Sequence, residues 1–301
     1  MLCFVVSLGI FCPGNLVAKL EDHLKKITDK DEGHQIRNVD FIYMINLDER
    51  PEKLASCLVQ LRPYGIEPYR FSAVNGRKLS REDLDDIGVR FKPGMREDIP
   101  GIHYPLDGGS PVCEPTNVPG RTYFFDLSLG VIGCSLSHLS ILQDAYDSGY
   151  STIWVMEDDI AVIRNPLLIS SCIDKLDQLI GPDGWDVLFT DQDTISNESG
   201  EYVPFLTSSS RPDFVPKNPG RFSQRVVIND EFRKVGARFG LYSVIIRRSG
   251  MKKVLDFAKK HNIFLPIDVE FYFPSDIKVY TVMDNIVSTQ RWAPSDNRKT
   301  P

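Results

Sequence analysis

The sequence predicts an α/β fold in a single domain, with a mainly parallel sheet flanked by helices. Short apolar runs rich in β-branched and aromatic residues alternate with longer amphipathic stretches along most of the chain. Near its start, a strand over 39–47, a helix from Pro51 to about Leu61 and a strand over 68–74 have the spacing of a parallel βαβ unit. With 301 residues, the chain can also bury a substantial core.

The next part of the chain predicts one short helix and one long helix. Ser80 is placed to begin the short one. Proline and glycine then interrupt residues 88–125, which we expect to form an irregular functional loop. Apolar residues recur at helical spacing over 129–148, and Gly149 follows where a C-terminal glycine is typical, so the longest helix is predicted there.

The C-terminal half continues the alternation. Residues 151–160 predict a buried central strand, and Asn165 with Pro166 predicts the start of a helix that ends near Ile180. The later elements are expected to be a strand over 185–190, a polar irregular segment over 196–236, a strand over 239–246, a helix capped by Ser249 and ending near His261, a strand over 277–282 and a tail without periodicity.

Three consecutive carboxylates, Glu157, Asp158 and Asp159, end the strand over 151–160. Acids this close repel one another, and a divalent cation such as Mg²⁺ or Mn²⁺ would remove the repulsion while sharing the site with substrate phosphates. In an open α/β sheet, ligands bind outside the carboxyl ends of the strands, where these side chains would lie. The alternative is a solvated strand end in which Asp158 or Asp159 caps a turn.

Charge and cysteine content limit the function classes. The formal net charge is −6 and the basic residues are scattered rather than grouped with aromatics, so we expect no nucleic-acid surface. The six cysteines lack the paired spacing of a structural zinc site. Cys57, Cys134 and Cys172 fall in predicted helices and are expected to be small core residues.

Residues 1–38 precede the first predicted strand and are interpreted as a leader. Their apolar part, 2–12, is similar to the hydrophobic region of a signal peptide, although no basic residue precedes it, and it is too short to span a bilayer. The alternatives are a membrane-dipping segment and a loosely packed extension. We favour a cytoplasmic or membrane-peripheral location, and the lumen of the secretory pathway if this segment is a signal peptide.

A set of short motifs follows the pattern of one family in the same order. They are Asn46-Leu47 with Arg50, the run Ser72-Ala73-Val74-Asn75-Gly76, the block from Gly130 to His138, the triplet Glu157-Asp158-Asp159, Ser249-Gly250, and Pro266-Ile267-Asp268. On these residues the sequence resembles glycosyltransferase family 25, which includes lipopolysaccharide and lipooligosaccharide galactosyltransferases and the procollagen galactosyltransferases. The resemblance extends to Gln290, so the glycosyltransferase domain is expected over 39–290, with a tail over 291–301.

The resemblance implies the Rossmann-like A-type fold of glycosyltransferases, a UDP-hexose donor, Mn²⁺ or Mg²⁺, and inversion at the sugar. Such a cation acts as a Lewis acid on the departing diphosphate. Glu157 and Asp159 are the candidate metal ligands, because residues two apart on a strand end point to the same side, with Asp158 turned toward the ribose or the sugar. The candidate donor-binding residues are Asn46, Arg50, Ala73, Asn75, Ser137 and His138, the last as a scaffold or phosphate contact. The alternative for Asn46 and Arg50 is a helix cap and a solvated side chain.

Inversion requires a group that accepts the proton of the attacking hydroxyl. Asp268 matches the second acidic position of the family and is the favoured catalytic base, with Asp191 second. The alternative for Asp191 and its neighbour Asp193 is an Asx-turn. The sequence departs from the family at Arg164-Asn165 and at Gln290, where collagen-directed members tend to carry a histidine, which weakens a collagen assignment and leaves a third metal ligand unidentified.

The predicted function is transfer of a hexose, galactose favoured and glucose as the alternative, from a UDP-sugar to a hydroxyl of a glycan such as lipopolysaccharide, or of a protein. The loops over 88–125 and 196–236 are expected to bind the acceptor. A second hypothesis is a non-catalytic protein that binds a sugar nucleotide or glycan, and the intact acidic triplet argues against it. A sugar nucleotidyltransferase should carry a glycine-rich phosphate loop after the first strand, and 46–51 lacks one.

Overall fold

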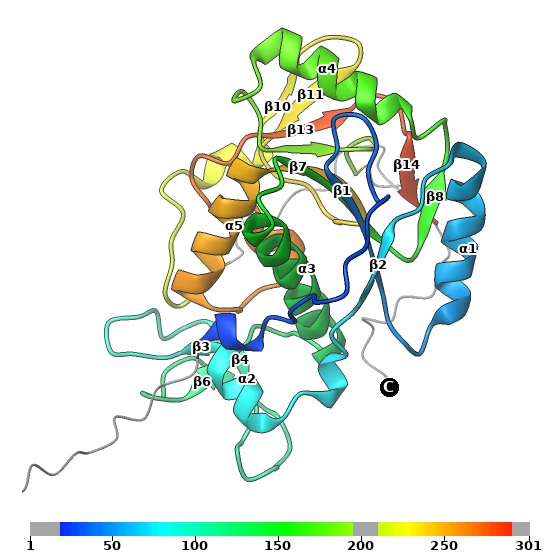
Figure 1. Ribbon diagram of the computed structural model, residues 1–301. Coiled ribbons are helices and arrows are strands. Elements are labelled where there is room, and N and C mark those ends of the chain that lie inside the picture. Colours follow the sequence, from blue (N-terminus) through cyan, green and yellow to red (C-terminus); the bar gives the residue numbers. More distant parts are fainter. Residues whose placement is uncertain (1–18, 195–209, 291–301) are drawn as a thin grey trace, which may run out of the picture.

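A sheet of eight strands forms the centre of the part of the chain that the computed structural model describes, residues 19–194 and 210–290 (Figure 1). Its strand order is β10-β11-β13-β9-β12-β7-β1-β2. These strands are β1 (Phe41–Asn46), β2 (Tyr69–Ser72), β7 (Thr152–Glu157), β9 (Val187–Phe189), β10 (Arg225–Val227), β11 (Phe232–Val235), β12 (Ser243–Arg247) and β13 (Val279–Val282). The acidic strand β7 is therefore an interior strand of the sheet.

The sheet is parallel on one side of β7 and mixed on the other. Strands β2, β1 and β7 run parallel, so Asn46, Ser72 and Glu157 lie at the same edge. Strand β12 lies antiparallel between β7 and β9, and β11 lies antiparallel between β13 and β10. The predicted α/β fold with a helix-flanked sheet is confirmed, but the sheet is mixed because β11 and β12 run against the other strands.

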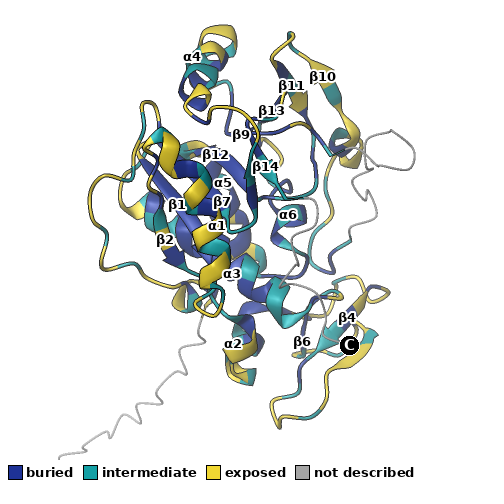
Figure 2. Ribbon diagram, turned by 90° about the vertical axis from the view of Figure 1, so that its right-hand side faces the viewer, coloured by how far each residue is buried: buried dark blue, intermediate teal, exposed yellow. Residues whose placement is uncertain are grey.

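Each face of the sheet is covered by its own helices. Tyr43 and Ile45 of β1 share a core with α3 and α5, whereas Ile42 and Met44 share a second core with α1 and α4, as alternation along a strand requires. Figure 1 shows α3 and α5 in front of the sheet, and Figure 2 shows the buried central strands. The helices are α1 (Pro51–Leu61), α2 (Arg81–Ile87), α3 (Leu129–Asp147), α4 (Leu168–Ile180), α5 (Arg248–His261) and α6 (Ile267–Glu270), with 3₁₀ turns η1 (Leu20–His23), η2 (Arg62–Tyr64), η3 (Gly76–Lys78) and η4 (Pro219–Ser223).

Two helix starts differ from the sequence prediction. Asn165 accepts a hydrogen bond from the backbone N–H of Leu167 at 3.0 Å and so caps a turn, and α4 begins only at Leu168. The hydroxyl of Ser249 donates to Asp186 at 2.6 Å from inside α5, so it does not cap that helix. In both cases the polar side chain makes its hydrogen bond to a group outside the helix that it was predicted to cap.

Residues 88–125, predicted to be irregular, contain four short strands. Strand β3 (Val89–Arg90) pairs with β6 (Thr122–Tyr123), and β4 (Pro100–His103) pairs with β5 (Val112–Pro115). A further pair, β8 (Ile160–Val162) and β14 (Val287–Thr289), follows the acidic triplet. These strands have two to four residues each, too few for apolar alternation to reveal them.

Among the helices formed by residues 19–194 and 210–290, none combines the length and apolarity that crossing a bilayer requires. The apolar segment 2–12 and the tail 291–301, on which two of the expectations rest, lie outside the described residues.

Candidate active site

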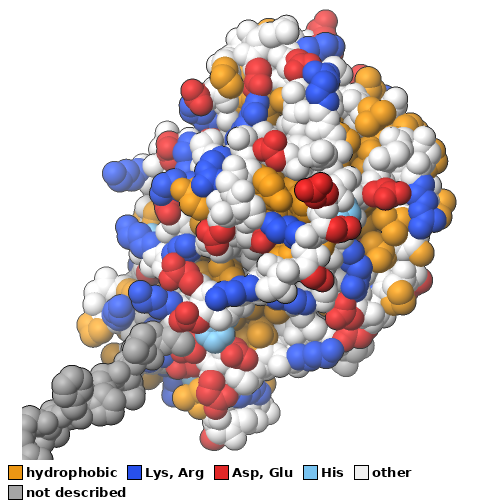
Figure 3. Space-filling view, in the orientation of Figure 1, with side chains coloured by type: hydrophobic (Ala, Val, Ile, Leu, Met, Phe, Trp, Pro, Cys, Tyr) orange, Lys and Arg blue, Asp and Glu red, His pale blue; other side chains and the backbone are white. Residues whose placement is uncertain are grey.

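An open pocket lies at the carboxyl ends of β1, β2 and β7. This is the sheet edge at which open α/β proteins bind their ligands. On the molecular face shown in Figure 3, acidic and basic side chains are interspersed, without a large area of one sign. The pocket is lined by seven of the residues predicted from the sequence, namely Asn46, Ala73, Asn75, Ser137, Glu157, Asp158 and Asp159.

One wall of the pocket depends on a close contact between the loop after β2 and helix α3. A Cβ atom on Gly76 would lie 1.7 Å from the carbonyl oxygen of Leu129, and one on Gly133 would lie 2.4 Å from that of Val74. Ser137 Oγ accepts a hydrogen bond from the backbone N–H of Val74 at 2.8 Å. Because only glycine allows the two backbones to approach so closely, the two glycines and Ser137 together fix this loop.

The acidic triplet begins at the last residue of β7 and continues into the turn before β8. Asn46 Nδ2 donates a hydrogen bond to Asp158 Oδ2 at 2.7 Å, and Lys53 Nζ lies 3.9 Å from Asp158 Oδ1. Since the chain turns after Glu157, strand alternation does not extend to Asp159. Both Glu157 and Asp159 nevertheless line the pocket.

Asp159 lies in surroundings that are unfavourable for a negative charge. Its Oδ1 atom is buried and has no hydrogen-bond partner. Burial, together with the carboxylates of Glu157 and Asp158, raises the pKa of Asp159 to about 7. An orphaned carboxylate oxygen beside two further carboxylates is donor chemistry that fits a hard divalent cation, because the cation would satisfy the oxygen and remove the repulsion.

Helix α3 presents Cys134 and His138 to Glu157. His138 is only 3% exposed, and its Nε2 lies 3.0 Å from Oε1 of Glu157. Cys134 Sγ lies 3.9 Å from the same oxygen, and Cys134 lines the pocket. Cys134 packs against the core, as expected, but it is only half-buried and its residue also forms part of the pocket wall.

Asp268, the favoured catalytic base, lies on the short helix α6. It accepts a long hydrogen bond of 3.3 Å from the backbone N–H of Gly240. Burial raises the pKa of Asp268, the hydrogen bond from Gly240 opposes this rise, and the charge of Glu157 adds to it. Asp268 does not line the pocket, but it lies near enough to Glu157 and His138 for their charges to affect it.

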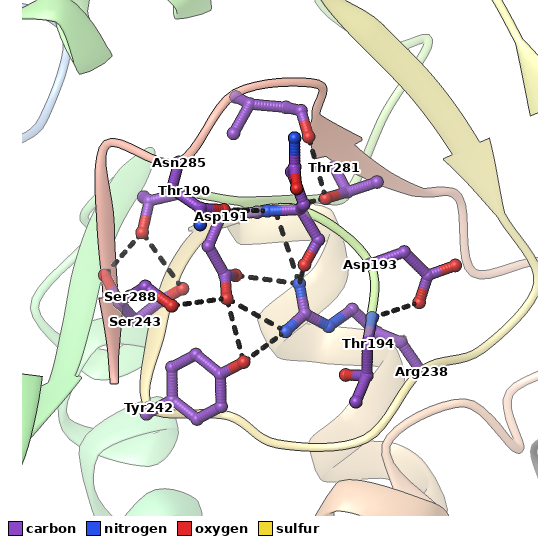
Figure 4. Close-up of polar contacts among 12 residues, drawn as sticks. Thr190, Asp191, Asp193, Thr194, Arg238, Tyr242, Ser243, Thr281, Asn285 and Ser288 are labelled. Carbon is purple, nitrogen blue, oxygen red and sulfur yellow. Dashed lines mark hydrogen bonds and ion pairs between the residues drawn. The ribbon is translucent and has the colours of Figure 1, made fainter. Parts of the chain in front are cut away.

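Asp191, the second candidate base, lies in a separate buried network (Figure 4). Its carboxylate is paired with the fully buried guanidinium of Arg238 at 2.7 Å and accepts hydrogen bonds from the hydroxyls of Tyr242 at 2.8 Å and Ser288 at 3.1 Å. Asp191 is 2% exposed and does not line the pocket. Such surroundings are typical of a structural ion pair, so Asp268 stays the favoured candidate base.

Arg50 and Asp193 are also held by partners outside the pocket lining. Arg50 Nε donates to Glu52 at 2.6 Å, and Asp193 is ion-paired with Arg225. Lys53, one turn beyond Arg50 on α1, lines the pocket instead. It was not expected from the sequence, although a lysine in the first turn of a helix at a strand end is a recognisable candidate for phosphate binding.

A sequence model described as "Glycosyltransferase family 25 (LPS biosynthesis protein)" matches residues 39–271, which is more than half of the chain. The chain belongs to glycosyltransferase family 25. The matched range includes the pocket and Asp268. The resemblance inferred from the short motifs is thereby confirmed.

The individual relatives that match this chain share less than 30% of its residues over the aligned range. A "Glycosyltransferase 25 family member" of Aedes aegypti is 28% identical over 189 residues, which cover 63% of this chain and 26% of that protein. A Drosophila melanogaster protein of the same description is 28% identical over 183 residues, 61% of this chain and 26% of its own length. An "Inactive glycosyltransferase 25 family member 3" of Mus musculus is 27% identical over 161 residues, 53% of this chain and 23% of its own. The chain thus spans about a quarter of the length of these relatives.

Gln290, the last residue of the expected glycosyltransferase domain, lies directly beside the acidic turn. Its backbone N–H donates to the carbonyl of Asp159 at 2.8 Å, and its side-chain amide donates to the carbonyl of Ile160 at 3.0 Å. The side-chain amide of Gln290 is therefore hydrogen-bonded to the backbone next to the acidic triplet.

Proposed function

We propose that this chain is a metal-dependent, inverting hexosyltransferase. The donor is a UDP-sugar, with galactose favoured and glucose as the alternative, and the acceptor is a hydroxyl of a glycan such as lipopolysaccharide, or of a protein. The observation that carries the proposal is the convergence of Glu157, Asp158 and Asp159 on one pocket at the carboxyl end of parallel strands. Membership of glycosyltransferase family 25 supports a sugar donor and a glycan acceptor in general.

In this proposal, Glu157 and Asp159 would hold Mn²⁺ or Mg²⁺. Both residues offer carboxylate oxygens, which these hard cations prefer, and Oδ1 of Asp159 lacks any other partner. When bound, the ion supplies Lewis-acid stabilisation of the negative charge that develops on the diphosphate leaving group. Asp158, oriented by Asn46, accepts hydrogen bonds from hydroxyls of the ribose or the sugar.

The remaining pocket walls position the donor. Lys53 places a positive charge 3.9 Å from Asp158, where it adds to the attraction for phosphate oxygens. The loop over 73–75, fixed against α3, gives the nucleotide a rigid surface. The side-chain amide of Asn75 donates a hydrogen bond to Glu49 at 3.2 Å, which orients Asn75 in this loop.

Asp268 takes the proton of the acceptor hydroxyl. As the acceptor oxygen bonds to the anomeric carbon from the face opposite the phosphate, the bond to the phosphate breaks, and the hydroxyl proton passes to the Asp268 carboxylate. The raised pKa of Asp268 makes its carboxylate a stronger proton acceptor than an exposed aspartate.

Release of UDP from a panel of UDP-sugars, with Mn²⁺ and candidate glycan acceptors, tests the proposal. We expect turnover that both EDTA and the substitution Asp159→Ala abolish. The matched control is Asp256→Ala, which removes a carboxylate that is 61% exposed on α5 and should leave turnover unchanged. Full turnover in Asp159→Ala would refute the metal assignment.

A second candidate function is non-catalytic binding of a sugar nucleotide or glycan. The observation that favours it is the 27% identity to a relative described as inactive. It predicts that UDP-sugars bind, that Asp159→Ala weakens this binding, and that neither hydrolysis nor transfer occurs. Turnover with any pair of donor and acceptor would exclude it.

A further inference from the structure

Helix α3 and strand β7 bring together three side chains whose donor atoms differ in kind. Cys134 and His138 are four residues apart and therefore lie on the same face of α3, opposite Glu157 at the end of β7. Cys134 Sγ, His138 Nε2 and a carboxylate oxygen of Glu157 all lie within 4.8 Å of one another. In the part of the chain that the structure describes, this is the one group of three such side chains at this closeness.

The separations between these atoms are near those of a metal site. With zinc–ligand bonds of about 2.0–2.3 Å in a tetrahedral arrangement, neighbouring ligand atoms lie roughly 3.3–3.8 Å apart. In the structure, Oε1 of Glu157 lies 3.0 Å from Nε2 of His138 and 3.9 Å from Sγ of Cys134. Sγ of Cys134 and Nε2 of His138 lie within 4.8 Å of each other, so a rotation of the Cys134 side chain toward His138 would complete the coordination.

The donor set and its burial favour a thiophilic ion. Thiolate sulfur and imidazole nitrogen select Zn²⁺ over Mg²⁺ or Mn²⁺, which prefer oxygen. His138 is 3% exposed and so rigidly placed, whereas Cys134 lines the pocket and the Glu157 side chain is 27% exposed. An ion can thus enter from the pocket, and three protein ligands leave a fourth position open toward it.

We propose that Cys134, His138 and Glu157 form a binding site for a thiophilic divalent cation such as Zn²⁺. Binding displaces the proton of the Cys134 thiol, because the thiolate is the ligand. Glu157 belongs both to this set and to the oxygen ligands of the proposed reaction. Zn²⁺ therefore competes with Mn²⁺ and lowers transfer, a consequence that rests on the proposed function, whereas Zn²⁺ binding itself does not.

Titration of the metal-free full chain with Co²⁺ tests the site without any transfer reaction. Co²⁺ bound to a thiolate gives a charge-transfer absorption in the near ultraviolet that oxygen ligands do not give. We expect this absorption to be displaced by Zn²⁺ and lost in Cys134→Ser, whereas Cys113→Ser, which removes an exposed thiol, should keep it. Loss of a side chain that only supports a metal ligand lowers metal affinity roughly 10- to 100-fold. Cys134 is proposed as a ligand itself, so Cys134→Ser should lower the Zn²⁺ affinity by at least that factor.

The substitution Asp159→Asn separates this inference from the proposed function. It should keep the Co²⁺ absorption, because Asp159 belongs only to the oxygen ligands, while it loses Mn²⁺-dependent transfer. An absorption that persists in Cys134→Ser, or that never forms, overturns the inference whether or not transfer is observed.

Alkylation of the wild-type chain gives a second measurement if Cys134→Ser does not fold. At a Zn²⁺ concentration about ten times Kd, reaction of Cys134 with iodoacetamide should slow roughly tenfold, since only the unbound thiol reacts. The rate at the exposed Cys113 should not change, as mass spectrometry of both peptides can show. Equal rates at Cys134 with and without Zn²⁺ would overturn the inference.

Discussion

Asn46 at the end of β1 donates a hydrogen bond of 2.7 Å to Asp158 in the turn after β7, and so joins the ends of two neighbouring parallel strands. Its Oδ1 accepts a hydrogen bond from Nε of Arg70 at 2.9 Å, and the residue is 1% exposed. The buried amide therefore bridges an acid and a base and fixes the orientation of Asp158.

Replacing this amide with a carboxylate should both destabilise the fold and weaken donor binding. In Asn46→Asp, repulsion of Asp158 replaces a hydrogen bond to a charged group, so we expect the free energy of unfolding to fall by about 1.5–3 kcal/mol. Thermal unfolding and the KM for the UDP-sugar measure the two effects. The control Asn218→Asp changes an exposed residue whose side chain makes no cap hydrogen bond, and an equal loss of stability there would contradict the role of Asn46.

The pKa of Asp159 predicts that pH and metal act together on stability. This carboxyl titrates near 3.8 when unfolded and at about 7 when folded, so between these values the folded chain binds more protons. The free energy of unfolding of the metal-free chain should therefore fall as pH rises through this window, by up to about 1.4 kcal/mol per pH unit. The difference in Tm between wild type and Asp159→Asn, measured in EDTA across the window, isolates this contribution.

Mn²⁺ should reverse that loss. Because the cation binds the ionised carboxylate, saturating Mn²⁺ should raise the Tm of the wild type more above the pKa of Asp159 than below it. A Tm increase that is the same in Asp159→Asn would place the stabilising cation elsewhere.

Breaking the ion pair between Asp191 and Arg238 should lower the free energy of unfolding rather than the rate of sugar transfer. In Asp191→Asn the guanidinium stays buried without its counter-charge, which should lower the free energy of unfolding by about 3–5 kcal/mol. Adding Arg238→Met should restore part of this loss. If Asp191 were also the base, kcat of Asp191→Asn would fall about 10²- to 10⁴-fold even well below its lowered Tm, whereas a purely structural role leaves kcat of the folded variant near that of the wild type. A chemical-denaturation curve and an activity assay at low temperature distinguish the two.

The contact between the loop after β2 and α3 leaves no room for a methyl group at Gly133. Gly133→Ala should therefore displace the loop that lines the pocket, destabilise the chain by about 1–3 kcal/mol and raise the KM for the donor. The control is Gly220→Ala, where the nearest atom to a new Cβ is the Asn218 side-chain oxygen at 3.5 Å. A wild-type Tm in Gly133→Ala, measured by scanning calorimetry, would show that the backbone can yield.

Sequence periodicity predicted those parts of the fold whose pattern lies within one short window. Helices α1 and α3 and the strands β1 and β7 each carry their apolar spacing locally. The rule that ligands bind at the carboxyl ends of parallel strands then predicted that the acidic triplet would lie at a ligand-binding edge, where Asn46 also lines the pocket. This part of the site follows from local pattern and one general rule.

The parts of the fold and of the site that the sequence did not predict depend on contacts between distant parts of the chain. Nothing near β12 reveals that it lies antiparallel between β7 and β9. The structural role of Asp191 depends on Arg238, 47 residues away, and without that partner an acid after a strand looks like a candidate base. The exposure of Cys134 likewise depends on which side of α3 faces the loop after β2.

Asp268 should be needed for transfer but not for donor binding. If it accepts the proton of the acceptor hydroxyl, Asp268→Asn keeps the shape of the residue and loses the base, so kcat should fall about 10²- to 10⁴-fold. Calorimetric titration with UDP and Mn²⁺ should give a Kd close to that of the wild type. The control Asp276→Asn, at a carboxylate that is 70% exposed, should change neither quantity.

The pH dependence of kcat adds an independent test of the same role. Burial raises the pKa of Asp268, so the carboxylate becomes ionised only above the usual range of an aspartate. Below that raised pKa the residue already carries a proton and cannot accept another, and kcat should therefore increase as pH rises through it. In Asp268→Asn the residual kcat should lose this rise. A rise that persists would assign it to another group, and parallel losses of UDP affinity and kcat would make Asp268 a donor-binding residue.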